Sequence, residues 1–321
     1  MENPVSAATK TGFLKLLLLN GAIMILPLPY KFATCEPFTD YLNITTPKGN
    51  GELIHSIIQP ILNVLGASEV QEGLFSLPEG AGTFRIRSRG RVDVLSASGG
   101  FLSVLRAHGF YGDYLVSFAE FEHRISMLHA TVDYRVDAPP AVEAVYELGK
   151  TGTLHLTRKA VLPEHVSRLT GPAADGRDTG TVYLGNRKNS DVWAKVYDKG
   201  HEALSKRGKD IGQLLRVEIA VQSDVGATLR DASVPHDIFY HFASRSLVEP
   251  PASFKCWEPH GKGFFLEHPR SDFTPIQQLK SILDNSPDIS RLIRLAKSSF
   301  GDEGLNELQR LFRNRFQLGS I

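Results

Sequence analysis

The sequence has few cysteines and lacks the motifs that bind the common cofactors. Only Cys35 and Cys256 occur among its 321 residues. They form no C-x-x-C pair, which argues against a disulfide framework or a zinc knuckle and favours a reducing, cytoplasmic location. No P-loop, Rossmann glycine fingerprint, H-E-x-x-H or G-x-S-x-G sequence is present. We therefore expect no nucleotide cofactor and neither zincin nor α/β-hydrolase chemistry.

A long uninterrupted apolar run is also missing. Residues 13–29 are largely apolar, but Lys15, Asn20, Pro27 and Pro29 interrupt them. The remaining stretches are shorter than the ~20 residues that a bilayer-spanning helix needs. We interpret residues 1–37 as a leader that forms an accessory helix or reflects a misassigned start site. Membrane attachment is the alternative.

The chain has almost no net charge, since its formal charge is +1 at pH 7. It is therefore not a polycation that coats nucleic acid, and a nucleic-acid site would need a local excess of basic residues. Such an excess lies between Lys150 and Glu218, where Lys and Arg outnumber Asp and Glu. It supplies enough cations for several phosphate contacts. From charge alone, however, a solvated face is the better explanation.

Alternating and β-branched segments predict a protein built mainly on strands. The expected strands are residues 38–46, 83–88, 91–97, 125–136, 151–158, 181–185, 192–199 and 215–222. Helices are expected over residues 52–65 and 139–148, where apolar residues recur at helical spacing. Strands with interspersed helices indicate an α+β fold with an antiparallel sheet and flanking helices, over residues 38–255.

The last part of the sequence changes to a helical pattern. Three helices are expected, over residues 276–283, 289–299 and 305–316, with basic faces. We interpret residues 256–321 as a small C-terminal helical accessory region. A plain solvated surface is the simplest explanation of these basic faces.

One predicted strand places three chemically useful side chains on the same face. Trp193, Lys195 and Tyr197 alternate with apolar residues over residues 192–199. A tyrosine hydroxyl titrates near pH 10, so attack on phosphorus at neutral pH needs nearby cations such as Lys195. In isolation Tyr197 is also explained as a packing side chain. Tyr183, followed by Arg187 and Lys188, is the competing nucleophile.

Another strand offers candidate metal ligands. His129 and Asp133 are four residues apart, so both project from one face of a strand. With Glu218 from a neighbouring strand they could bind one divalent ion. Hydrogen-bonded structural roles are the alternative for both residues.

Three ordered segments resemble the replication-initiation-factor family of rolling-circle initiators and related conjugative relaxases. They are Gly180-Thr-Val-Tyr-Leu-Gly-Asn-Arg187, Val192-Trp-Ala-Lys-Val-Tyr-Asp-Lys-Gly200 and Arg216-Val-Glu-Ile219. Upstream, Asp40-Tyr-Leu-Asn-Ile-Thr is similar to the family's opening strand, and Ser98-Gly-Gly-Phe is similar to its glycine-containing turn. The resemblance covers residues 38–250.

The resemblance implies a DNA nicking and closing enzyme in which Tyr197 attacks a phosphodiester. The products would be a 5′-phosphotyrosine and a 3′-hydroxyl for a polymerase. Asp133 and Glu218, with His129 where the family commonly has an acid, would hold Mg²⁺ or Mn²⁺. The residues expected to contact single-stranded or hairpin origin DNA are Arg187, Lys188, Trp193, Lys199 and Arg216, with Lys195 assisting Tyr197.

Two other functions remain open at this point. A conjugative relaxase would use the same chemistry, and a catalytically inactive DNA-binding regulator would keep the sheet without nicking. The replacement of an acid by His129 is the feature that favours the regulator. Asn189 lies as an extra residue before Ser190, which leaves the local alignment open. The C-terminal helical region could supply origin specificity or contact a host helicase, with a plain solvated surface as the alternative. A homodimer is a further open expectation.

Overall fold

The computed structural model describes residues 15–19, 22–169 and 180–260, together with five isolated positions from 297 to 306. Most of its strands form one ten-stranded sheet in the order β4-β5-β6-β7-β3-β8-β12-β11-β10-β9. Every pair of neighbouring strands in this sheet is antiparallel. Within the described residues, no helix is long and apolar enough to cross a membrane.

The sheet consists of two halves with the same strand order. The first half runs through β3 (Phe38–Pro47), α1 (Asn50–Val64), β4 (Ser68–Gln71), β5 (Leu74–Ser76), β6 (Thr83–Arg89) and β7 (Val92–Ala97). The second half runs through β8 (Arg124–Tyr134), α4 (Ala138–Lys150), β9 (Val166–Leu169), β10 (Thr181–Leu184), β11 (Val192–Asp198) and β12 (Leu215–Gln222). In each half, the first strand leads through a helix to the outer edge, and the chain returns strand by strand.

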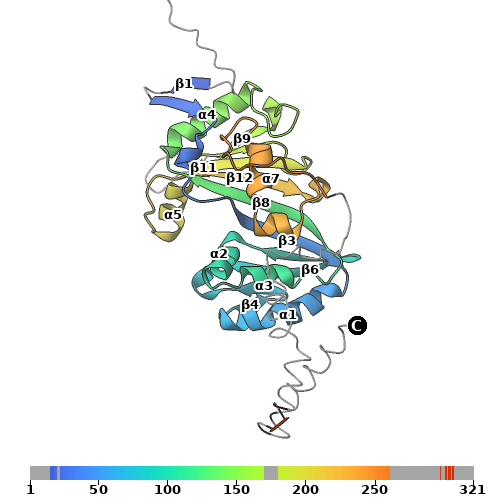
Figure 1. Cartoon of the computed structure of the whole chain (residues 1–321). Coiled ribbons are helices and arrows are strands. Elements are labelled where there is room, and N and C mark those ends of the chain that lie inside the picture. The colour runs from blue at the N-terminus through green and yellow to red at the C-terminus, as the bar shows by residue number, and fades with distance from the viewer. Residues whose placement is uncertain are drawn as a thin grey trace, which may run out of the picture.

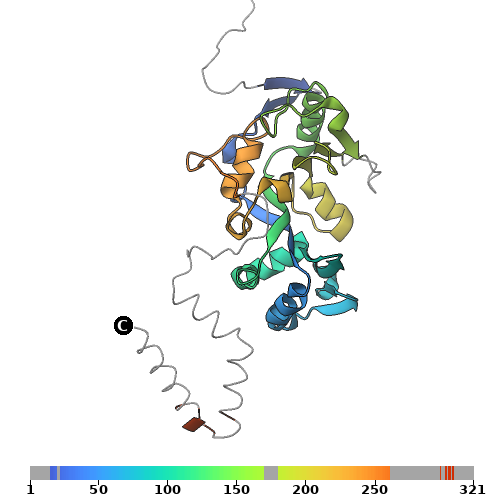
Figure 2. The same cartoon turned by 90° about the vertical axis from the view of Figure 1, so that its right-hand side faces the viewer.

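The first strands of the two halves pair with each other at the centre of the sheet. β3 and β8 are antiparallel, and Tyr41 lies opposite His129. The register shifts between Thr39 and Tyr41, so Asp40 is an extra residue in β3. Such a bulge re-aims a side chain. We call the β3–β8 pairing the seam, and Figures 1 and 2 show it between the first-half helices α1 to α3 and the second-half helices α4 to α7.

Shorter helices complete the two halves. α2 (Gly99–Ala107) and α3 (Tyr111–Val116) follow β7, and α5 (Lys199–Arg207) connects β11 to β12. α6 (Leu229–Ser233) and α7 (His236–Ala243) follow β12. Asp198 caps α5, since its side chain accepts a hydrogen bond from the backbone N–H of His201 at 2.8 Å. The cap places Lys199 and Glu202 of α5 directly after the end of β11.

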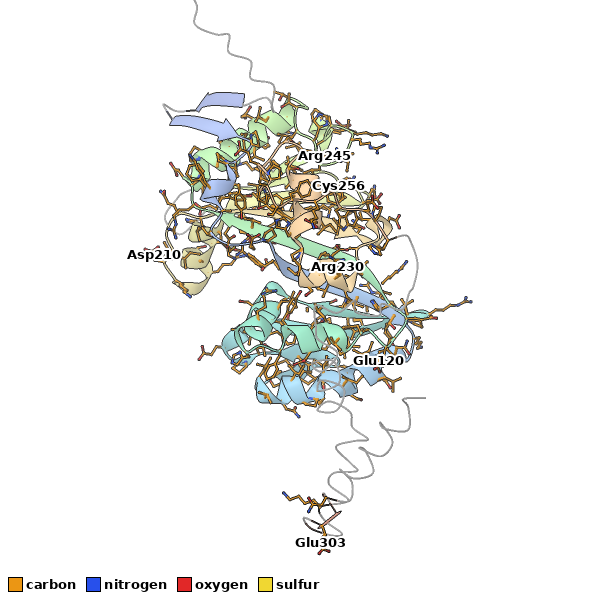
Figure 3. All side chains as sticks on the ribbon, in the orientation of Figure 1. Glu120, Asp210, Arg230, Arg245, Cys256 and Glu303 are labelled. Carbon is orange, nitrogen blue, oxygen red and sulfur yellow. The ribbon has the colours of Figure 1, made fainter. Side chains whose placement is uncertain are left out.

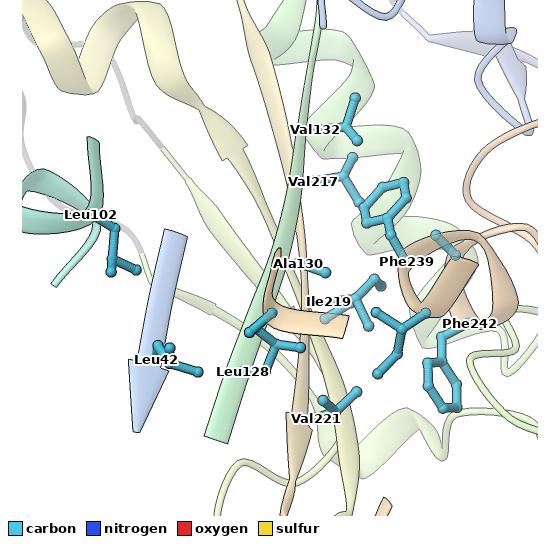
Figure 4. Packing of buried hydrophobic residues seen from close by; sticks show 14 of the residues in the cluster. Leu42, Leu102, Leu128, Ala130, Val132, Val217, Ile219, Val221, Phe239 and Phe242 are labelled. Atoms are coloured by element: carbon cyan, nitrogen blue, oxygen red, sulfur yellow. The ribbon is translucent and has the colours of Figure 1, made fainter. Parts of the chain in front are cut away.

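One face of the sheet is apolar and covered by helices. Val217, Ile219 and Val221 of β12 are buried on this face, and Figure 4 shows them beside Phe239 and Phe242 of α7. α4 covers the same face further along, where Gly149 lies against the side chain of Leu184. Burying this apolar area stabilises the sheet. The alternate residues of the same strands are left for the opposite face, which we call the open face.

Residues 15–19 and 22–37, which precede β3, belong to the folded protein. β1 (Lys15–Leu19) and β2 (Ala22–Leu26) form an antiparallel hairpin that lies beside α4 (Figure 1). Leu28 is buried and donates its backbone N–H to Leu247 at 2.8 Å. The expectation of a leader helix within residues 1–37 is wrong for this part, because its apolar residues pair as strands.

Most predicted elements in residues 38–255 are confirmed. The exceptions are informative. Residues 151–158 form no strand, and the chain there makes only one isolated bridge, from His155 to Ala160. The strand after α4 is β9, which begins at Val166. Ser98-Gly-Gly-Phe is not a turn but the start of α2, with Ser98 as its cap. The three helices expected from residue 276 onward lie outside the continuously described residues.

Candidate functional site

The open face of the second half carries three rows of side chains. In the first row, Tyr197 of β11 lies opposite Arg216 of β12, which lies opposite Asp133 of β8. The second row runs from Lys195 through Glu218 to Thr131. The third runs from Trp193 through Ala220 to His129 and Tyr41. Strand register therefore brings together most of the residues that the sequence singled out.

Tyr197 and Glu218 form the central pair of the site. The Tyr197 hydroxyl donates a hydrogen bond to Glu218 Oε1 at 2.8 Å. Tyr197 is 4% exposed and Glu218 is 2% exposed. A hydroxyl hydrogen-bonded to a carboxylate is the arrangement in which the carboxylate can accept the hydroxyl proton.

Glu218 is ionised in spite of its burial. Burial alone would raise the pKa of its carboxyl. His129, with Nδ1 3.5 Å from Oε2, and Lys195, with Nζ 3.2 Å from Oε1, outweigh burial and bring the pKa to about 2. Glu218 is therefore a weak proton acceptor while both of these groups remain beside it.

Tyr197 is held as a neutral phenol. Burial raises the pKa of its hydroxyl above the ordinary value, and the negative charge of Glu218 raises it further. Arg216 acts in the opposite direction. Lys195 Nζ lies 3.9 Å from the centroid of the Tyr197 ring, and Lys199 Nζ lies 5.8 Å from it. Two lysines therefore lie beside the ring, but the phenol stays protonated because burial and Glu218 outweigh them.

Arg216 joins the two halves through an ion triad in which the guanidinium is buried and the two carboxylates are half-buried. Its Nε and Nη2 donate to the two carboxylate oxygens of Asp133 at 2.6 and 2.8 Å. Its Nη1 donates to Asp40 Oδ2 at 3.2 Å, across the seam. Arg216 is 8% exposed. Its guanidinium is thus committed to two carboxylates, whereas the sequence predicted a contact with DNA.

The site forms a cavity of about 520 Å³ in the open face. Its lining comes from both halves of the sheet and from two helices. The lining residues are Phe38, Asp40, Tyr41, Gly99, Gly100, Ser103, His129, Tyr183, Arg187, Trp193, Lys195, Tyr197, Lys199, Glu202, Arg216 and Glu218. Lys199 is held on its wall by Glu202, with Nζ 2.7 Å from Oε2.

A second cavity, of about 710 Å³, adjoins the first. Tyr41, His129, Arg187 and Trp193 line both cavities, so they form the partition between them. The Arg187 guanidinium lies 4.6 Å from the ring centroid of Tyr183 and 5.9 Å from that of Trp193. Lys188 lines only the second cavity. The expected DNA contacts Arg187, Lys188 and Trp193 therefore surround the space next to the Tyr197 cavity.

The predicted metal ligands are not brought together as a set. His129 and Glu218 are adjacent, and His129 Nε2 is buried without a hydrogen-bond partner in the described part of the chain. Asp133 is separate, because Arg216 occupies both of its oxygens. No three His, Cys, Asp or Glu side chains of the described residues could hold a metal ion. The trio therefore does not fit a metal as arranged, and dependence on Mg²⁺ or Mn²⁺ stays a prediction.

The structure adds residues that the sequence reasoning missed. Asp40 reaches Arg216 only because the bulge re-aims it, and a bulge leaves no regular trace in a sequence. Gly99 allows the start of α2 to approach β3, since a Cβ there would lie 2.4 Å from Asp40 Oδ1. The contact of Glu202 with Lys199 could have been predicted from a helix beginning at Lys199, because side chains three residues apart on a helix are neighbours.

Comparisons with known proteins give little about function. No protein-family model matches the chain, and no curated protein matches it. Among solved structures, the rolling circle replication initiator protein from Geobacillus stearothermophilus matches at 15% identity and a TM-score of 0.45, covering 78% of this chain and 97% of that chain. The di-domain ARO/CYC BexL matches at 11% identity and a TM-score of 0.19, covering 65% and 94%. Similarity at this level does not identify a function, which must come from the side chains of the cavity.

Proposed function

We propose that this protein nicks and rejoins single-stranded DNA, with Tyr197 as the nucleophile. The observation that carries the proposal is the Tyr197 hydroxyl, hydrogen-bonded to a buried carboxylate at 2.8 Å in a cavity lined with cations. A nucleophile, a proton acceptor and positive charge for a phosphate are the groups that phosphoryl transfer to tyrosine requires.

The chemistry is a transesterification that consumes no nucleotide. Glu218 accepts the Tyr197 proton, and the phenolate oxygen forms a bond to phosphorus. The bond from phosphorus to the 3′-oxygen breaks, and that oxygen takes up a proton to become a 3′-hydroxyl. The 5′-phosphate stays on Tyr197 as a phosphodiester, so the reverse attack by a 3′-hydroxyl rejoins the strand.

Arrival of the DNA phosphate activates this resting pair. Lys195 holds Glu218 at 3.2 Å in the free protein and lowers its basicity. A phosphate in the cavity competes for Lys195 and Lys199. As Lys195 turns towards the phosphate, the pKa of Glu218 rises and its carboxylate becomes a better proton acceptor. The same cations stabilise the charge that develops on the phosphate oxygens.

The sequence resemblance supplies the biological setting of the proposal. Rolling-circle initiators cut one strand at an origin and leave a 3′-hydroxyl that a polymerase extends. The segments around Arg187, Tyr197 and Glu218 that resemble this family all contribute to the two cavities. A conjugative relaxase would use the same site. Genomic neighbours distinguish the two, since transfer genes favour the relaxase.

A catalytically inactive DNA-binding regulator is the second candidate. Its supporting observation is the bidentate pair between Arg216 and Asp133, which removes one expected metal ligand. A regulator would bind DNA at the same cations and leave it uncut. Covalent attachment to DNA separates the two candidates.

The test is covalent capture of single-stranded DNA by the full chain. We expect wild-type protein to become attached to pooled oligonucleotides, with peptide mapping placing the adduct on Tyr197. Tyr197→Phe should reduce attachment by more than about 10⁴-fold, and Tyr183→Phe, the matched control, should retain it. Attachment that survives in Tyr197→Phe assigns the nucleophile elsewhere. Binding without attachment in wild type, with Mn²⁺, with Mg²⁺ and with chelator, identifies a regulator.

A further inference from the structure

A row of arginines lies on the open face of the first half. Arg85, Arg87 and Arg89 alternate along β6 with Ile86 and Ser88. Phe84, on the same side of the strand as these two residues, is buried in the core. Arg87 and Arg89 are exposed, and Arg85 is half-buried. Side chains two residues apart on a strand project on the same side and are separated by about 6.6 Å. We call these three residues the arginine row.

Strand register places the arginine row on the same face as the Tyr197 site. Arg85 lies opposite Ser96 of β7, which lies opposite Asn43 of β3. Asn43 and Tyr41 are two residues apart and share a face of β3, and Tyr41 lies opposite His129. The open face is thus continuous from the row, across the seam, to the cavities. Four strand spacings separate β6 from β12, or about 19 Å.

The charge of the arginine row is not neutralised within the described part of the chain. None of its three members makes an ion pair or a side-chain hydrogen bond there. Arg106, Arg168 and Arg216, by contrast, all donate hydrogen bonds to oxygen atoms of the protein. The acidic residue of the adjacent strand, Asp93, points to the other face, where it binds the start of α1.

We propose that the arginine row binds the sugar-phosphate backbone of the single strand that flanks the scissile phosphate. This inference rests on the proposed function, which supplies the strand and its position at Tyr197. Three like charges in a row repel each other and favour a polyanion as a partner. The row lies on the same face as Tyr197 but beyond reach of the reacting phosphate, so it acts on affinity and not on the chemical step.

A structural explanation of the row makes a different prediction. β5 pairs with β6 only from Thr83 to Arg85, so Arg87 and Arg89 lie where that side of β6 has no strand partner in the described chain. Charged residues on such an edge prevent pairing with other proteins, and either sign of charge serves this purpose. Binding to DNA requires positive charge. Reversal of the charge therefore separates the two explanations.

The experiment measures binding of single-stranded oligonucleotides by full-length protein that carries Tyr197→Phe, so that binding alone is observed. We compare Arg85→Gln/Arg87→Gln/Arg89→Gln with the corresponding triple Glu variant. A matched control, Arg158→Gln/Arg230→Gln/Arg245→Gln, removes the same charge from exposed positions outside the sheet. Figure 3 labels two of these control residues, Arg230 in α6 and Arg245 two residues after the end of α7.

We expect the triple Gln variant to reduce the salt dependence of binding to a long oligonucleotide. Loss of three phosphate contacts lowers the slope of log K against log salt concentration by about 2. The control variant should keep the wild-type slope, and the Glu variant should bind less than the Gln variant. A short oligonucleotide that contains only the nucleotides at the scissile phosphate should bind to all variants with equal affinity.

Two results overturn the inference. One is an unchanged slope in the Gln variant, and the other is wild-type binding by the Glu variant, which assigns the row to edge protection. Failure of the proposed function is recognised separately. In that case protein with Tyr197 intact forms no covalent adduct, whatever the slopes measured in the binding assay.

Discussion

The two halves of the sheet share a strand order but use their buried carboxylates differently. Asp93 lies on β7, the last strand of the first half, and Glu218 lies on β12, the last strand of the second. Asp93 Oδ2 accepts hydrogen bonds from the backbone N–H groups of Gly49 and Gly51 at 2.7 and 3.1 Å. Glu218 instead accepts from a tyrosine hydroxyl and a lysine.

The difference follows from the face of the sheet to which each carboxylate points. Asp93 faces the helices, so it satisfies N–H groups that the start of α1 leaves without partners. Glu218 faces the cavity, where its partners are side chains that can move or exchange protons. The same chemical group therefore stabilises the fold in one half and is available for chemistry in the other.

Replacing the cavity carboxylate should have the largest effect on activity. Glu218→Gln removes the proton acceptor of Tyr197 while nearly preserving its shape, so the rate of covalent attachment should fall by about 10²- to 10⁴-fold. Single-turnover assays with single-stranded oligonucleotides measure this rate. Asp93→Asn is the matched control and should attach DNA at the wild-type rate per folded molecule. Equal losses in the two variants would contradict the distinction between the halves.

Breaking the ion triad should have the next largest effect, this time on folding. Arg216→Met leaves the half-buried carboxylates of Asp133 and Asp40 without their cation. Removal of one partner from a fully buried pair costs about 3–5 kcal/mol, and the partial exposure of the two carboxylates lowers the expected loss to about 2–4 kcal/mol. Denaturant unfolding measures the loss, with Arg230→Met at an exposed site as control. A change below about 1 kcal/mol would mean that the triad does not hold the seam together.

Replacing the helix-facing carboxylate should have a smaller effect on stability. Asp93→Asn weakens the hydrogen bonds to Gly49, Gly51 and Ser88 and should cost about 1–3 kcal/mol. Burial acts to raise the pKa of the Asp93 carboxyl, but its hydrogen bonds outweigh burial and lower the pKa below 3.8.

This lowered pKa fixes the sign of the pH dependence. The stability that Asp93 contributes is present above the ordinary carboxyl pKa and is lost as the pH falls below it. Thermal unfolding of wild type and Asp93→Asn should therefore differ at neutral pH and converge in acid. A difference that grows in acid would contradict this assignment.

The regular elements could be predicted from sequence because their patterns are local. The alternation over residues 192–198 and 215–222 gave both strands and the face that each side chain occupies. Once these two strands are neighbours in the sheet, the contact between Tyr197 and Glu218 follows from their shared face. The hypothesis of an α+β antiparallel sheet is confirmed for the described residues.

Other features depend on tertiary structure and left no local signal. The Asp40 bulge exists only in the pairing of β3 with β8. Arg216 was expected to contact DNA because the sequence shows its positive charge. The sequence does not show its two carboxylate partners, which lie on strands far away along the chain. Residues 151–158 have strand-like composition, but the chain continues past them to Val166 before it joins the sheet.

The seam also sets an order of events during synthesis. Chains are synthesised from the N-terminus, and domains generally fold as units. Phe38, Asp40 and Tyr41, which form one wall of the cavity, precede Tyr197 by more than a hundred residues of chain. When β12 leaves the ribosome, its two neighbours in the sheet, β8 and β11, have already been synthesised. Glu218 on β12 is the last lining residue to be synthesised, so the cavity is complete only after β12 has joined the sheet between β8 and β11.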